Sequence, residues 1–157
     1  MSEEANGPVD ESPLNVLAIG LLDRPGAAHG VAEVFSGRGL QMEAFHGTAG
    51  SLNPDGQAQA LILFRADPDR ANLVIRVIRR LSSVSSAELL AADDPRIIQS
   101  VLIAISDASA PMGINITPLD PQTALAAGSP TAMQTWLASS VAPRRLGALR
   151  LDLLLKH

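Results

Sequence analysis

The stretch Asp23–Gly26 places an acid, a base, a proline and a glycine directly after an apolar run. Residues 15–22 are predicted to form a short buried strand and residues 27–38 a helix, so this stretch makes a tight strand-to-helix turn. Backbone N–H groups at the start of a helix attract a small anion such as a carboxylate. The sequence alone therefore leaves two interpretations of the turn.

In the first interpretation the turn binds a small ligand. In the second it is only a turn, in which Pro25 fixes φ, Gly26 takes the bend and Asp23 caps the helix. His29 lies one helical turn further on and is expected to be solvated, the alternative being contact with a ligand near Asp23.

No other arrangement of residues predicts chemistry. The chain has no cysteine and three histidines, none of them paired at a metal-ligand spacing, so no metal site is predicted. A nucleophile elbow, a Walker-type phosphate loop and a dinucleotide fingerprint are absent, so neither catalytic residues nor a cofactor are predicted. Asp93-Asp94 stands before Pro95, where a turn is more plausible than an acid–base pair.

The composition limits the classes of partner. Of the 157 residues 46% are apolar and only 3% aromatic, so base-stacking platforms for nucleic acid are not expected. The net charge is −4, and the acidic tail 1–13 accounts for all of it. The remainder is neutral and has no broad field for nucleic acid or an anionic membrane. With no secretory signal and no membrane-length apolar run, a cytoplasmic location is expected.

Two basic pairs, Arg79-Arg80 and Arg144-Arg145, are expected to be a solvated helix end and a solvated loop. The alternative for both pairs is contact with an acidic partner protein.

The first half of the chain predicts the order β-α-β-β-α-β. Strands are expected at 15–22, 40–48, 58–65 and 83–90, and helices at 27–38 and after the Asp67-Pro68 cap signal. In the strand 40–48 alternation places Phe45 on the face opposite Leu40, Met42 and Ala44. The apolar stripe of the second helix is predicted as Leu73, Val74, Val77, Ile78 and Leu81. This order is that of the ferredoxin-like α+β unit.

The second half repeats that order without its first helix. Strands are expected at 97–105, 114–117, 123–126 and 148–155, with a loop at 106–113 and a helix capped by Ser129-Pro130. The predicted organisation is a disordered tail (1–13), a complete domain (14–92) and a truncated domain (93–157).

Two strands have apolar residues on both faces. In the strand expected at 58–65, one face carries Ala58, Ala60, Ile62 and Phe64, and the other face carries Leu61 and Leu63. In 148–155, one face carries Leu149, Leu151, Leu153 and Leu155, and Leu154 lies on the other. A sheet with helices on one side only is polar on its other side. The second face is therefore expected to be covered by a partner subunit or by the second repeat, and a homodimer is expected.

The turn at 23–26, followed by Phe35–Glu43, resembles the ACT domain, a ligand-sensing module of ferredoxin-like topology. Ile116–Pro118, Leu125–Gly128 and Leu137–Ser139 are similar to segments of the second domain of the regulatory (small) subunit of acetolactate synthase. The resemblance covers residues 14–155. The sequence differs from that family in having Asp23, Arg24 and Gln41 in place of Asn, Glu and Asn, and in lacking a helix in the second domain.

The resemblance implies a non-catalytic, allosteric regulatory protein of branched-chain amino-acid biosynthesis. A small amino acid such as valine, leucine or isoleucine would bind at a dimer interface, and the partner would be the thiamine-diphosphate-dependent catalytic subunit. Gly26 with the N–H groups of Ala27 and Ala28 would hold the ligand carboxylate, and Asp23 the ammonium. Gln41 of a neighbouring subunit would close the site. The full set implied is Asp23, Arg24, Pro25, Gly26, Ala27, Ala28 and Gln41.

Two alternatives remain open from the sequence. The first is a stand-alone adaptor that kept the fold and changed its partner. The second is a structural dimerisation module with no ligand. The fold alone does not decide between them, because function depends on the site.

Overall fold

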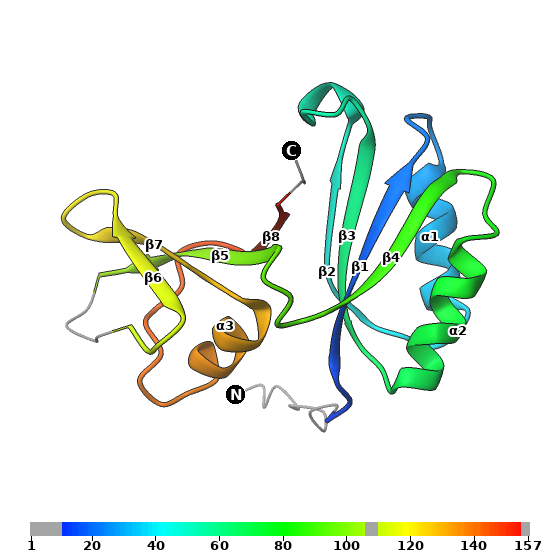
Figure 1. Cartoon of the computed structure of the whole chain (residues 1–157). Coiled ribbons are helices and arrows are strands. Elements are labelled where there is room, and N and C mark those ends of the chain that lie inside the picture. Colours follow the sequence, from blue (N-terminus) through cyan, green and yellow to red (C-terminus); the bar gives the residue numbers. More distant parts are fainter. Residues whose placement is uncertain (1–10, 106–109, 155–157) are drawn as a thin grey trace, which may run out of the picture.

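The apolar run before Asp23 forms β1 (Leu14–Leu21), an inner strand of an antiparallel sheet. The computed structural model describes residues 11–105 and 110–154. The sheet also contains β2 (Met42–Thr48), β3 (Ala58–Arg65) and β4 (Val84–Ala91), in the order β2-β3-β1-β4. Helices α1 (Ala27–Ser36) and α2 (Pro68–Ile78) cover one face (Figure 1). We call these elements the first unit; they confirm the predicted ferredoxin-like order.

The second sheet repeats the strand order of the first. It contains β5 (Ile97–Ala104), β6 (Ile114–Pro118), β7 (Thr123–Gly128) and β8 (Arg150–Leu153), in the order β6-β7-β5-β8. Helix α3 (Pro130–Leu137) packs on one face. Of the loop predicted at 106–113, residues 106–109 lie outside the described residues, and 110–113 are not helical. We call these elements the second unit.

Side-chain caps fix the starts of two helices. The Asp67 carboxylate accepts a hydrogen bond from the N–H of Arg70 at 2.9 Å, and the Ser129 hydroxyl accepts one from Ala132 at 3.2 Å. A proline follows each cap, at the position where its missing N–H costs nothing. Both predicted starts are confirmed.

The core of the first unit lies between the sheet and its two helices. Phe35 of α1 and Phe64 of β3 meet edge to face, with ring centroids 5.1 Å apart. The predicted stripe of α2 is wrong at Leu73, which is 43% exposed, while Ile75 is buried. At about 100° per residue Ile75 shares a face with Ala71 and Ile78, whereas Leu73 turns outward.

The alternation predicted for 40–48 is wrong at Phe45, because β2 contains a bulge. Met42 pairs with Phe64 and Ala44 with Leu63, so Glu43 is the extra residue. After the bulge Phe45 packs on the same core as Met42, while Ala44 faces the other side of the sheet.

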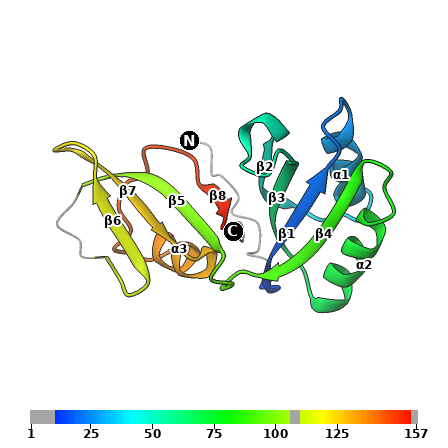
Figure 2. The same cartoon turned by 45° about the horizontal axis from the view of Figure 1, so that its top comes forward.

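The second repeat covers part of the open face of the first sheet. The strand β8 lies beside that face (Figures 1 and 2). Its Leu151 and Leu153 pack against the face, in a cluster that we call the junction. The buried members are Val16, Ala18, Leu61, Leu63, Leu90, Ile97 and Leu151. Of the two covers expected from the sequence, this one is confirmed. Leu155 lies outside the described residues.

The connection between the sheets is a tight turn from Ala91 to Ile97, closed by a hydrogen bond from the N–H of Asp94 to the carbonyl of Ala91. At the N-terminal end of the described chain, the carbonyl of Pro13 accepts hydrogen bonds from the side chain of Asn15 and from the backbone N–H of Ala66. Of the tail predicted at 1–13, residues 1–10 lie outside the described residues. The division into domains at 14–92 and 93–157 stays a prediction.

Candidate functional site

The turn between β1 and α1 is built around Gly26. Its φ is +86° and its ψ −9°, a left-handed conformation that glycine adopts at little cost. A Cβ placed on Gly26 would meet no atom within 4 Å, so the requirement here is conformational and the space above the residue is open. Gly26 is itself the N-cap of α1.

Asp23 does not cap α1, so that part of the second interpretation is wrong. No side chain caps this helix. The Asp23 carboxylate instead accepts a hydrogen bond from the N–H of Gly50 at 3.0 Å, at the start of the short 3-10 helix η1 (Gly50–Leu52). Asp23 therefore ties the β2–β3 connection to the turn, and its remaining lone pairs can accept further hydrogen bonds.

The turn is tied to the loop before β4 as well. The Arg24 guanidinium donates to the Ser82 hydroxyl at 3.3 Å, and the N–H of Leu22 donates to the carbonyl of Ser83 at 2.9 Å. The turn is thus hydrogen-bonded both to the β2–β3 connection and to the loop before β4.

The N-terminus of α1 presents unpaired donors. The N–H of Ala27 makes a long bond of 3.4 Å to the carbonyl of Arg24, whereas within the described chain the N–H groups of Ala28 and His29 have no acceptor. The first turn carries no acidic side chain. His29 is exposed as expected, and pairs with Glu33 at 3.3 Å. The helix start is therefore open to an anion.

A surface depression of about 200 Å³ lies beside this helix start. Of the seven residues implied by the resemblance, Asp23, Arg24, Ala27 and Ala28 line it, whereas Pro25 and Gly26 shape the turn without lining it.

Two polar side chains in this depression, Thr48 and Gln59, were not predicted as site residues. They are paired in register at one end of β2 and β3. The signal for Gln59 was a lone polar residue in the otherwise apolar strand 58–64.

Gln41 lies away from this depression. It precedes β2, whose first residue pairs with Phe64, while the turn follows the end of β1 that pairs with Ala58. The seven residues of β2 span about 20 Å. Within one chain Gln41 and the turn are therefore at opposite ends of the sheet.

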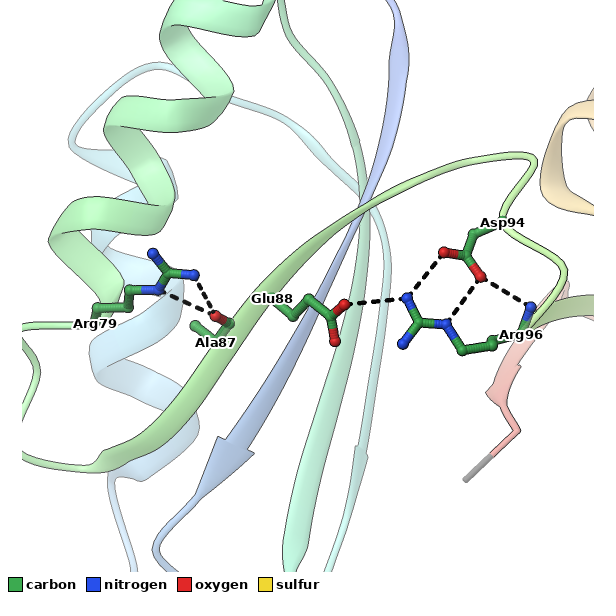
Figure 3. Close-up of polar contacts among 5 residues, drawn as sticks. All are labelled: Arg79, Ala87, Glu88, Asp94 and Arg96. Carbon is green, nitrogen blue, oxygen red and sulfur yellow. Dashed lines mark hydrogen bonds and ion pairs between the residues drawn. The ribbon is translucent and has the colours of Figure 1, made fainter. Parts of the chain in front are cut away.

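The Asp93-Asp94 pair lies in a turn, as predicted. Asp94 accepts from the backbone and guanidinium of Arg96, which also reaches Glu88 at 3.0 Å (Figure 3). Hydrogen bonds donated by the side chain and then by the backbone N–H of Arg96 lower the pKa of Asp94, and the hydrogen bonds that Arg96 donates to Asp94 and Glu88 raise its own pKa. The cluster fixes the connection between the units.

Arg79 is not merely solvated, contrary to the expectation for Arg79-Arg80. Its guanidinium donates two hydrogen bonds, at 2.9 and 3.1 Å, to the carbonyl of Ala87 on the edge strand β4 (Figure 3). It satisfies a backbone acceptor that the sheet leaves unpaired.

No group of three or more potential ligands could hold a metal ion among residues 11–105 and 110–154. Within the same residues no helix is long and apolar enough to cross a membrane.

Comparison with known proteins gives structural but not sequence matches. No described protein family and no curated protein matches the sequence. The acetolactate synthase small subunit from Thermotoga maritima matches with a TM-score of 0.52 and 13% identity, over 89% of this chain and 93% of that one. The ligand-free regulatory subunit of aspartate kinase from Thermus thermophilus gives a TM-score of 0.43 and 19% identity, over 80% and 89%.

The first match carries the structural conclusion, since it spans most of both chains. At this identity it defines the fold alone. The chain has the ferredoxin-like ACT arrangement, in the fold of the acetolactate synthase small subunit.

Proposed function

We propose that this chain is a non-catalytic regulatory protein that senses a small amino acid at the β1–α1 turn. The observation that carries the proposal is the depression beside the uncapped start of α1, where unpaired N–H groups and the Asp23 carboxylate lie together. An amino acid offers the complementary pair, a carboxylate for the helix start and an ammonium for Asp23.

The proposal includes a homodimer. The strand β2 lies at the edge of its sheet, where a second copy can pair. In such a dimer Gln41 of the partner subunit reaches the turn, which Gln41 of the same chain does not. By resemblance, the regulated enzyme is acetolactate synthase, and a branched-chain amino acid is the effector. Ligand binding would favour one dimer arrangement and thereby change the catalytic partner.

Two observations favour the alternative, an adaptor or dimerisation module without a ligand. Asp23 is already engaged with Gly50, and about 200 Å³ is below the usual range of ligand pockets, roughly 300–1,000 Å³. In a dimer the depression would be deepened by the partner, so its size in one chain does not decide between the two.

The first experiment is thermal unfolding with each of the twenty amino acids at millimolar concentration. A ligand at 100 times its Kd adds about 2.7 kcal/mol to the free energy of unfolding, a rise of several degrees in Tm for this chain length. A rise with valine, leucine or isoleucine supports the acetolactate synthase proposal. A rise with another amino acid keeps the sensor and changes the pathway, and no rise favours the alternative.

Two isosteric variants then test the site. Asn and Asp both tolerate the left-handed conformation of Gly26, so Gly26→Asn and Gly26→Asp strain the backbone equally. Only Gly26→Asp adds a negative charge where the ligand carboxylate would bind. It should abolish binding, and Gly26→Asn should retain some, while sedimentation shows both variants dimeric. Equal loss in both variants would contradict carboxylate binding at the turn.

A further inference from the structure

A second cavity lies where the two units meet, on the face of the first sheet opposite its helices. Its volume is about 460 Å³, and its lining comes from β2 and β3 of the first unit and from β5, α3 and the segment 145–149 of the second. We call it the junction cleft. It shares no lining residue with the depression at the β1–α1 turn.

The floor of the junction cleft contains an unsatisfied amide. Gln99 of β5 is fully buried, and neither its Oε1 nor its Nε2 has a hydrogen-bond partner in the described chain. Its neighbours on the same face, Ile97 and Val101, are apolar. An unpaired buried polar group costs about 1–3 kcal/mol, so this amide needs a partner that the chain does not supply.

The charges around the junction cleft favour an anion. The Glu43 carboxylate is neutralised by Arg65 at 2.8 Å. Arg145 lines the cleft and, in the part of the chain that the structure describes, has no ion-pair partner. His46 also lines it. The cleft therefore carries an uncompensated guanidinium.

The walls indicate that the anion has an apolar body. Ala44, Leu63 and Leu149 contribute apolar lining, and the volume lies within the roughly 300–1,000 Å³ of small-molecule sites. An inorganic ion would leave these walls without a partner.

We propose that the junction cleft binds a small organic carboxylate, with Arg145 holding its charge and the amide of Gln99 hydrogen-bonded to the same carboxylate. The amide is sealed in the empty cleft, so a lining side chain must rotate to admit the ligand. Gln134 of α3 is a half-buried polar member of the same lining. Because the site spans both units, binding fixes them in one arrangement.

The test uses NMR of the side-chain amide groups of the full chain. The Gln99 signals are assigned from their loss in Gln99→Met, and the probes are butanoate and its neutral analogue butanamide. Butanoate should shift the Gln99 signals saturably. Loss of a charged hydrogen bond weakens binding about tenfold or more, so butanamide should bind that much more weakly.

Two variants separate this site from general charge effects. Arg145→Gln should weaken butanoate binding about tenfold or more, whereas the neighbouring Arg144→Gln, outside the cleft, should leave it unchanged. Gly26→Asp should also leave it unchanged, so failure of the turn site and failure of this one are distinguishable. Unshifted Gln99 signals, or equal binding by the two arginine variants, would overturn the proposal.

The variant Gln99→Met gives an independent readout without ligand. Since it replaces an unpaired amide by an apolar side chain of similar length, its Tm should equal or exceed that of the unchanged protein. A clearly lower Tm would mean that the amide already has a partner, and would overturn the proposal as well.

Discussion

The two units have the same strand order, but their sheets are covered differently. The first sheet has α1 and α2 on one face and β8 on part of the other. The second has α3 on one face, while on the other Leu102 remains 38% exposed beside a cavity of about 450 Å³. Helix α1 thus gives the first unit a second helix in its core and a helix start without a side-chain cap. The described part of the second unit has only α3, whose start is capped by Ser129.

The largest expected effect is in the core between the first sheet and its two helices. Phe64→Ala removes a fully buried ring that packs on Phe35, and should lower the free energy of unfolding by about 3–5 kcal/mol. Urea unfolding followed by circular dichroism measures the loss. The single tryptophan, Trp136 of α3, reports on the second unit by fluorescence. If its transition does not move with that of the first unit, the units unfold independently.

The junction is the next test. Leu151→Ala removes a buried side chain of β8 that packs on the first sheet, and should cost about 2–3 kcal/mol. It should also separate the circular dichroism and fluorescence transitions, because the contact between the units is weakened. Leu154→Ala, at a side chain that is 56% exposed, is the matched control and should change stability by less than about 0.5 kcal/mol. Equal losses would argue against the junction as a stabilising contact.

The capped helices allow a direct comparison of the units. Asp67→Ala in α2 and Ser129→Ala in α3 each remove a side-chain cap before a proline, and each should cost about 1 kcal/mol. Chemical denaturation measures both losses. Since the hydrogen bond of Asp67 is shorter and charged, its loss should be the larger. The reverse order would show that α3 depends on its cap more than α2 does.

The smallest effect concerns the turn between the units. Hydrogen bonds from Arg96 lower the pKa of Asp94 in the folded chain, so its contribution is present above the unfolded pKa of about 3.9 and is lost as the pH falls through the folded value. Thermal unfolding should show Asp94→Asn slightly less stable than the unchanged protein at pH 6, with the difference shrinking below about pH 4. A difference that persists at lower pH would contradict this origin.

The sequence predicted the fold through local signals. The apolar runs of β1 and β3 and the caps at Asp67 and Ser129 depend on neighbouring residues alone. The errors arose where a distant contact decides. The bulge at Glu43 turns Phe45 into the core, and Asp23 bonds to Gly50 instead of capping α1.

The same reason explains what was missed at the sites. Thr48 and Gln59 lie beside the turn only because of the register of β2 and β3. In the sequence Gln99 resembles any other strand residue, and its burial depends on distant elements, β8 and α3. Whether Gln41 belongs to the site depends on the proposed second copy, because within one chain Gln41 lies at the other end of the sheet from the turn.

The position of β8 has a consequence for biosynthesis. The ribosome synthesises Leu61 and Leu63, which form the apolar face, well before Leu151, which covers it. Leu151 follows Ala91, the last residue of β4, by 60 residues. At about 5–20 residues per second this interval is on the order of several seconds, during which a nascent first unit exposes one side of its sheet. A chaperone that recognises apolar surface should therefore bind the nascent chain in this interval and be released when β8 pairs with β5.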